Sequence, residues 1–176
     1  MQLLESINDL APLHNPNNVL WIKICMEQFP SIPNVAVFDT SFHSSMEADH
    51  YLYPINYDLV QKYKIRKYGF HWTSHQFVYE RACEILWLAP SNAKLITCHI
   101  GSGASITAVK NWKVVETSMW FSPLDWLMMW TRSGSIDPSI VTYLVWKLNM
   151  TADQVETMLN KQSWLLWISG ISSDLR

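Results

Sequence analysis

Four stretches of the sequence place residues that can do chemistry in otherwise apolar surroundings. The first runs from Val37 to His43 and carries Asp39 directly after residues 34–38, of which the last four are apolar. If those residues form a buried strand, Asp39 stands at its end, where α/β folds commonly place catalytic groups. A carboxylate that only caps the following turn is the alternative, and both interpretations stay open.

The second stretch, Tyr68 to His75, contains two histidines at i and i+4. His71 and His75 could both bind a metal ion from one face of a helix, but no carboxylate accompanies them there. The sequence therefore favours a helix start capped by Thr73, with a packed histidine, over a metal site.

The third and fourth stretches could bind anions. Residues 98–105 lead a strand into Gly101-Ser102-Gly103, and backbone N–H groups in such small-residue loops can bind phosphate. The established phosphate-loop patterns are absent, so an ordinary tight turn is the favoured reading of this motif alone. Arg132, flanked by hydroxyl residues, suits an anionic group, although a solvated loop arginine is equally consistent.

The elements that must position these residues alternate between strands and helices, an α/β pattern. Strands are expected at 34–38 and 94–100 and in a hairpin of 104–109 and 114–117. Helices are expected over 17–28 and 73–86, and from Asp137-Pro138 and Thr151 onward, because capping residues or a proline mark each start. The inward face of the helix over 73–86 is expected to consist of Phe77, Val78, Ala82, Ile85 and Leu86.

Composition excludes several classes of protein. Hydrophobic residues make up 49% of the 176 residues and charged residues 16%, which is too apolar for a disordered chain. A net charge of -2 without a basic block disfavours a nucleic-acid partner. No apolar run is long enough to cross a membrane, no signal peptide is recognisable, and the three widely spaced cysteines fit free thiols. A cytoplasmic globular protein is expected.

One pair of counts is unusual, because the chain has 10 tryptophans and only 5 glycines. Average glycine usage would give roughly 12 in a chain of this length. Trp112 stands in Lys110-Asn111-Trp112-Lys113, between the two hairpin strands, where a two-residue turn requires positive φ and favours Asn-Gly.

Taken together, six segments resemble, in matching order, the motifs of the acetate and propionate kinase family, which has glycine in place of Trp72. They are residues 11–16, 35–43, 66–75, 97–105, 127–134 and 168–176. The resemblance covers essentially the whole chain. It implies an α/β, actin-like ATPase fold of two ribonuclease-H-like domains, with residues 1–41 ending the N-terminal domain and 42–176 beginning the C-terminal, nucleotide-binding one.

The implied reaction is reversible phosphoryl transfer from ATP to acetate, with Mg²⁺ as cofactor. By family likeness the catalytic residues are Asp39, His71 and Arg132. The nucleotide would be bound by His99, Ile100, Gly101, Ser102, Gly103, Asp174, Leu175 and Arg176. The methyl group of acetate would lie against Leu13, Phe70 and Pro123. A homodimer of the full-length protein is also implied, with neither a nucleic-acid nor a membrane partner.

The chain departs from the family pattern in two places. Ser102 occupies a position where the family usually has Asn, and Ser135 occupies a position where it usually has Asp. The family's N-terminal phosphate- and metal-contacting residues, its first substrate-binding arginine and its C-terminal metal-binding glutamate have no counterpart, so no metal ligand is expected here. The chain resembles the middle of an acyl kinase and is expected to be inactive alone.

Most of the tryptophans fall at glycine positions of the family motifs. The clearest are Trp72, Trp112, Trp120, Trp126, Trp130, Trp164 and Trp167, whereas Trp21 fits the pattern and Trp87 and Trp146 are less diagnostic. A TGA codon that the organism reads as glycine, translated as tryptophan, would produce this pattern. The natural protein is therefore expected to carry glycine at most of these positions.

An alternative treats the tryptophans as functional. A catalytically inactive kinase remnant could present an aromatic face to a sugar or a protein, with Trp126 and Trp130 as one stripe at i and i+4. Preference for acetate, propionate or butyrate is left open by the residues.

Overall fold

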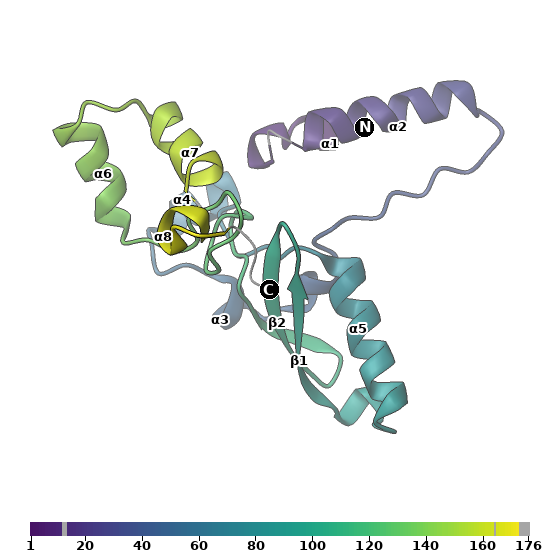
Figure 1. Ribbon diagram of the computed structural model, residues 1–176. Helices are drawn as coiled ribbons and strands as arrows, with labels where there is room; N and C mark the ends of the chain where they lie inside the picture. The colour runs from purple at the N-terminus through teal and green to yellow at the C-terminus, as the bar shows by residue number, and fades with distance from the viewer. Residues whose placement is uncertain (12–13, 164, 173–176) are drawn as a thin grey trace. The chain divides into compact units, whose positions relative to one another are not determined.

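A computed structural model describes residues 1–11, 14–163 and 165–172 (Figure 1). The chain divides into two compact units, Met1–Phe38 and Asp39–Arg176, near the domain boundary expected at residue 41. Among the described residues, no helix has the length and apolarity that a membrane span requires.

The first unit is helical. It contains α1 (Gln2–Glu5), the 3₁₀ helix η1 (Asn8–Leu10) and α2 (Asn15–Gln28), with Pro16 in the first turn of α2 as the sequence predicts. The strand expected at 34–38 is wrong, because these residues form no strand and Val35 is 85% exposed. A strand depends on hydrogen bonds to a neighbour, and none of the described strands pairs with this segment.

The second unit is built on a three-stranded antiparallel sheet in the order β1 (Lys94–Ile100), β2 (Ala104–Lys110) and β3 (Lys113–Thr117). The hairpin between β2 and β3 turns through Asn111 at φ 53° and Trp112 at φ 71°. Both positive values agree with the turn expected from the sequence. Helix α5 (Trp72–Ile85) runs alongside the β1–β2 hairpin (Figure 1).

Helix α5 buries a face that differs from the expected one. His75, Tyr79 and Cys83, spaced at i, i+4 and i+8, are buried, whereas Phe77 is 65% exposed and Ile85 is 61% exposed. Hydroxyl groups of the sheet bind His75, and Tyr79 and Cys83 pack in an apolar cluster, so partners far along the chain select the buried face. The capping box expected at Thr73 is also wrong, because the helix begins at Trp72 after His71 and no side chain caps it.

The remaining described elements are short. They are η2 (Phe42–Ser45), α3 (Ala48–Tyr51), α4 (Tyr57–Tyr63), η3 (Pro90–Asn92), α6 (Pro138–Lys147), α7 (Ala152–Lys161) and α8 (Leu165–Ser169). The expected start of α6 is confirmed by the Asp137 carboxylate, which accepts a hydrogen bond from Ser139 N. The expected start of α7 is confirmed by the reciprocal bonds of Thr151 and Gln154. Residues 118–137 contain no helix or strand, so Trp126 and Trp130 are not a helical stripe.

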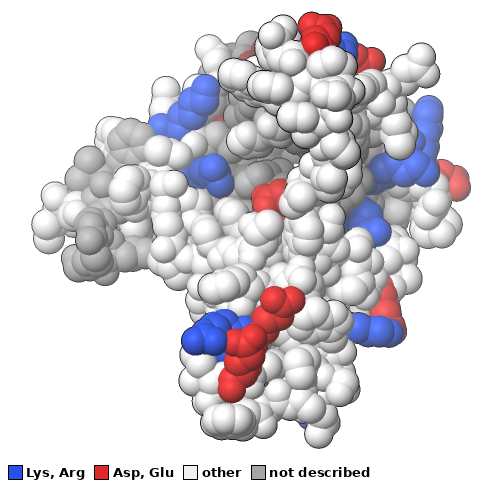
Figure 2. Space-filling view, turned by 90° about the vertical axis from the view of Figure 1, so that its right-hand side faces the viewer, with Lys and Arg blue, Asp and Glu red and all other residues white. Residues whose placement is uncertain are grey.

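The core of the second unit combines an apolar cluster with a buried polar layer. The cluster consists of Phe42, Met46, Tyr79, Cys83, Ala93, Val109 and Val114. The polar layer consists of His43, His75, Thr97, Ser105, Thr107, Thr117 and Ser118, all at most 3% exposed. On the face seen in Figure 2, most of the surface is uncharged, and lysines and arginines lie among aspartates and glutamates.

Burial keeps two of these histidines neutral. It is the main cause that lowers the pKa of His43 to about 3 and that of His75 to about 4, and neighbouring imidazoles lower both further. An imidazole in the unfolded chain keeps its ordinary pKa of about 6.5. Below that value the unfolded chain therefore binds protons that the folded chain does not.

Three tryptophans lie in the left-handed region, namely Trp87 at φ 55°, Trp112 at φ 71° and Trp126 at φ 62°. Trp87 follows α5, and Leu88 N donates to Cys83 O as in a Schellman motif, in which this position is usually glycine. The backbone thus supports glycine at Trp87, where the sequence motifs were less diagnostic.

We expect Trp87→Gly to raise the free energy of unfolding by about 1 kcal/mol, because an L-residue in this conformation carries roughly that strain. The Trp87 side chain is 94% exposed, so little packing is lost with it. Trp146→Gly is the matched control, since Trp146 is 78% exposed but lies within α6. It should destabilise by roughly 0.5 kcal/mol. Urea unfolding of both variants measures the difference, and equal effects of the two changes would contradict the strain argument.

The free energy of unfolding should fall as the pH decreases from about 8 to about 5, by at most ~1.4 kcal/mol per pH unit for each buried histidine. The sign follows because His43 and His75 must bind protons on unfolding. His43→Asn should make the dependence shallower, whereas His50→Gln should not, because the His50 side chain is 39% exposed in the folded protein. A urea-unfolding series across this range that is independent of pH would contradict the expectation.

Candidate active site

The segment that presents His71 has an unusual backbone. Gly69 has a φ of +71° and His71 a φ of 60°, so two left-handed residues flank Phe70. A Cβ on Gly69 would overlap the ring of His43, and only glycine allows this approach. Left-handed conformation at a residue other than glycine costs about 1–3 kcal/mol and is concentrated at functional sites. The segment is held in part by a hydrogen bond of 3.0 Å from Trp72 N to Asp39 O.

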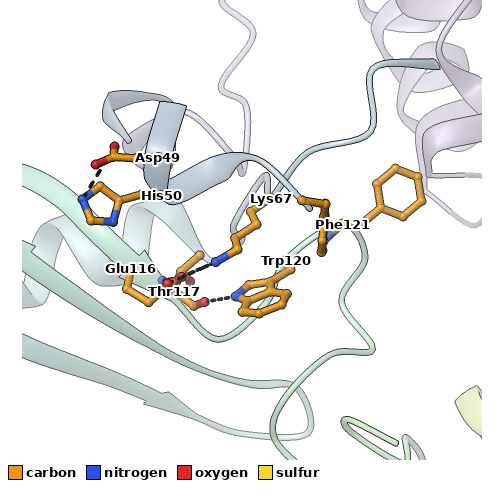
Figure 3. A network of polar contacts seen from close by, with 8 residues as sticks. Asp49, His50, Lys67, Glu116, Thr117, Trp120 and Phe121 are labelled. Atoms are coloured by element: carbon orange, nitrogen blue, oxygen red, sulfur yellow. Dashed lines mark hydrogen bonds and ion pairs between the residues drawn. The ribbon is translucent and has the colours of Figure 1, made fainter. Parts of the chain in front are cut away.

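Lys67 anchors the approach to this segment. Its ammonium group lies 3.1 Å from Oε2 of Glu116 on β3 and 3.8 Å from the centroid of the Trp120 ring (Figure 3). Tyr68 N donates to Trp120 O over 2.8 Å, so the backbone is tied to the same loop. The Lys67 side chain is only 10% exposed, which makes this ion pair stronger than a surface pair.

His71 and Arg132 converge on Gly103. A Cβ placed on Gly103 would lie 3.4 Å from His71 Nε2 and 3.6 Å from Arg132 Nη1. The guanidinium is held by a hydrogen bond of 3.1 Å to the carbonyl oxygen of Pro123. Because Gly103 has no side chain, the guanidinium group of Arg132 and Nε2 of His71 both lie close to its backbone.

The electrostatics of this point suit an anion. Burial is the main cause that lowers the pKa of His71. The nearby His99 and Arg132 lower this pKa further, whereas Asp39 raises it. Burial also lowers the pKa of Arg132. Because both groups lose solvent contacts without gaining a fixed anionic partner at Gly103, a bound anion would stabilise the charged form of each.

The loop from His99 to Gly103 is a tight turn in which Gly101 N donates to Gly103 O over 3.0 Å. The His99 ring stacks on that of His71, with centroids 4.0 Å apart and the planes inclined by 23°. Ile100, Gly101 and Ser102 are exposed. The structure thus brings the loop expected to bind phosphate directly beside His71.

Two of the three residues expected around the acetate methyl group, Phe70 and Pro123, have contacts close to this point. Phe70 packs against the buried cluster of Ala104, Met119 and Met129, and the carbonyl of Pro123 binds Arg132. Four further residues expected at the site lie outside the described residues, namely Leu13, Asp174, Leu175 and Arg176.

Sequence reasoning missed the hydroxyl residues beneath His71. His71 Nδ1 lies 2.7 Å from Ser105 Oγ, and His75 Nε2 lies 2.7 Å from the same oxygen. His75 Nδ1 lies 2.7 Å from Thr97 Oγ1, so both nitrogens of His75 are occupied and it is not a metal ligand. The alternation of Thr97, Ser105 and Thr107 with apolar residues along the strands was the signal that could have found this layer.

The described residues contain no group of three or more His, Cys, Asp or Glu side chains that could hold a metal ion. Asp39 is exposed and is the carboxylate that acts electrostatically on His71. Asp39 is therefore the carboxylate near His71 that Mg²⁺ could contact.

Comparisons with known proteins address the family of the chain. The model of the acetokinase family matches residues 1–176. The chain is 56% identical to the acetate kinase of Thermoanaerobacterium thermosaccharolyticum, over 99% of this chain but 44% of that protein. It superposes with a TM-score of 0.91 on the crystal structure of Porphyromonas gingivalis acetate kinase, at 44% identity over 98% of this chain and 43% of the other.

A propionate kinase from Francisella tularensis is similar to the same extent. Its TM-score is 0.89 at 48% identity, and the match covers 95% of this chain and 43% of that one. The chain thus spans less than half the length of these relatives, and it has the α/β fold of the corresponding part of their structures. It belongs to the acetokinase family.

Proposed function

We propose that the chain is part of an acetate kinase, which transfers a phosphoryl group reversibly between ATP and acetate to give acetyl phosphate and ADP. The observation that carries the proposal is the convergence of His71 Nε2 and Arg132 Nη1 on Gly103. Phosphoryl transfer needs little covalent help from the protein and depends mainly on positioning and charge neutralisation. An imidazole and a guanidinium aimed at one small recess can supply that neutralisation.

In this proposal His71 and Arg132 donate hydrogen bonds to the equatorial oxygens of the phosphoryl group in flight. Acetate is ionised at neutral pH, so no general base has to remove a proton from it. Asp39 acts electrostatically on His71, and its carboxylate would help to hold the magnesium–phosphate assembly when that is bound. By the family resemblance, Phe70, Pro123 and Leu13 are the residues that would contact the methyl group.

The nucleotide would be held by the loop from His99 to Gly103 and by Asp174, Leu175 and Arg176. The glycines support this role because they leave room for a phosphate beside the imidazoles of His71 and His99. Mg²⁺ would neutralise charge on the phosphates when bound, and Asp39 is the residue of the described chain that could contact it. Other ligands would have to come from the rest of a full-length protein.

The remaining parts of the proposal concern the whole protein. Residues 1–41 would end its N-terminal domain, and residues 42–176 would begin its C-terminal domain, in an actin-like ATPase of two ribonuclease-H-like domains. We further propose that it acts in the cytoplasm as a homodimer. Acetate is favoured as substrate by the acetate kinase relatives, and the propionate kinase relative makes propionate the alternative.

The full-length gene product should form acetyl phosphate from ATP and acetate in a hydroxamate assay, whereas the 176-residue chain alone should not. The isolated chain lacks the family's first substrate-binding arginine and its metal-binding glutamate. A single arginine of this kind contributes roughly 10³–10⁵ in rate. Assays with acetate, propionate and butyrate would assign the preferred acid. A full-length product that phosphorylates none of them would contradict the proposal.

In the full-length protein, Arg132→Ala should lower kcat by roughly 10³-fold and change KM for acetate much less, because the guanidinium acts mainly on the transition state. Arg81→Ala is the matched control, since Arg81 lies on the outside of α5 with its side chain 60% exposed. It should leave kcat unchanged. A raised KM with an unchanged kcat in Arg132→Ala would assign Arg132 to ground-state binding instead.

A further inference from the structure

A continuous row of hydrogen bonds runs from the backbone of β2 to the imidazole of His71. Thr97 Oγ1 donates to Thr107 O over 3.3 Å, and the same oxygen lies 2.7 Å from His75 Nδ1. Ser105 Oγ then lies 2.7 Å from both His75 Nε2 and His71 Nδ1. Thr97, Ser105 and His75 are at most 3% exposed, so water does not compete for these bonds.

The direction of the row is inferred from its first hydrogen bond, the one between the Thr97 hydroxyl and Thr107 O. A backbone carbonyl can only accept, so in this arrangement the hydroxyl proton of Thr97 lies on the bond to Thr107 O. Thr97 Oγ1 must then accept from His75, which places the proton of neutral His75 on Nδ1 and leaves Nε2 as an acceptor. Burial keeps His75 neutral. A neutral imidazole has one donor and one acceptor nitrogen.

The same reasoning continues through Ser105. Its single hydroxyl proton is donated to His75 Nε2, so Ser105 Oγ can only accept from His71. His71 Nδ1 must therefore carry a proton, and Nε2, the nitrogen that faces Gly103 and Arg132, carries the lone pair whenever His71 is neutral.

We infer that Thr97, His75 and Ser105 form a hydrogen-bond relay that holds neutral His71 in its Nδ1–H tautomer. Ser105, which touches His71, and His75 and Thr97, which act through Ser105, are positioning residues. The tautomer follows from the geometry, and its consequence for catalysis rests on the proposed function.

The consequence is that His71 can donate to a phosphoryl oxygen only after it binds a second proton, at Nε2. Asp39 favours that proton, whereas burial, His99 and Arg132 oppose it, and the ring of neutral His75 lies beside His71. A phosphoryl group between His71 and Arg132 would add negative charge and favour protonation. With the relay in place, His71 would carry a proton that it can donate from Nε2 mainly when the anion is bound.

The test determines the tautomer of His71 in the 176-residue chain labelled with ¹⁵N-histidine. Two samples are compared, one with the unchanged sequence and one with Trp87→Gly. Long-range ¹H–¹⁵N correlation spectra near pH 8 distinguish a protonated ring nitrogen from one with a lone pair, and His71→Gln and His75→Gln assign the signals. Both neutral histidines should be protonated at Nδ1. An Nε2–H form of either would overturn the inference.

Thr97→Val tests the relay at a distance, because this nearly isosteric change removes a hydroxyl that does not touch His71. Without this hydroxyl, His75 can carry its proton on Nε2 and donate it to Ser105. The Ser105 hydroxyl can then donate to His71 Nδ1, so His71 should lose its Nδ1–H form. Ser105→Ala should have the same effect on His71 directly. Ser74→Ala is the control, since Ser74 binds only the stacked ring of His99 at 2.9 Å, and it should leave the His71 tautomer unchanged. An unchanged His71 in both Thr97→Val and Ser105→Ala would contradict the relay.

These spectra do not depend on catalysis, so they separate a failure of the relay from a failure of the proposed function. In a full-length protein that makes acetyl phosphate, Thr97→Val should lower kcat with KM for acetate unchanged and should move the pH profile of kcat. A variant with an unaltered pH profile would confine Thr97 to a structural role.

Discussion

Ser105 has one hydroxyl proton and two imidazoles to satisfy. Its Oγ lies 2.7 Å from a nitrogen of His71 and 2.7 Å from a nitrogen of His75, in a layer that excludes water. Because buried polar groups must be paired, this oxygen fixes how α5 sits on β2 as well as how the two rings are oriented. The unexpected buried face of α5 follows directly, since His75 can be satisfied only by turning toward the strands.

The loop before α5 depends on the same layer. Gly69 allows the backbone to pass against the ring of His43, whose Nε2 binds Thr107 Oγ1 over 3.0 Å. The left-handed His71 then starts the helix with its ring directed toward Gly103 rather than toward the core. The ion pair of the buried Lys67 with the partly exposed Glu116 ties this approach to β3. The strained residue is therefore supported from both sides, as pre-organised sites require.

Short sequence motifs predicted correctly the turns and helix starts that depend on neighbouring residues alone. The β2–β3 turn at Asn111 and the starts of α6 and α7 depend on one or two residues each, and all are present as expected. The segment 34–38 and the buried face of α5 depend on partners far along the chain, and apolar patterning predicted both incorrectly. Phe77 and Val78 on α5 are exposed although their spacing suggests a core face.

For the site, the motifs predicted that His71, Arg132 and the Gly101–Gly103 loop belong together, but not how they meet. The convergence at Gly103 requires the coordinates, because residues 118–137 form no regular element from which a direction could be inferred. The alternation of Thr97 and Ser105 with apolar residues indicates a buried hydroxyl layer, but it does not indicate that these hydroxyls bind His71 and His75.

The central claim is that His71 and Arg132 together enclose a phosphoryl group over Gly103. The most direct measurement is a crystal structure of the full-length gene product with ADP, Mg²⁺, acetate and a planar aluminium fluoride that mimics the phosphoryl group in flight. The account predicts fluorine atoms within hydrogen-bonding distance of His71 Nε2 and the Arg132 guanidinium, with the acetate methyl against Phe70. A fluoride bound elsewhere, with both side chains directed away from it, would contradict the account.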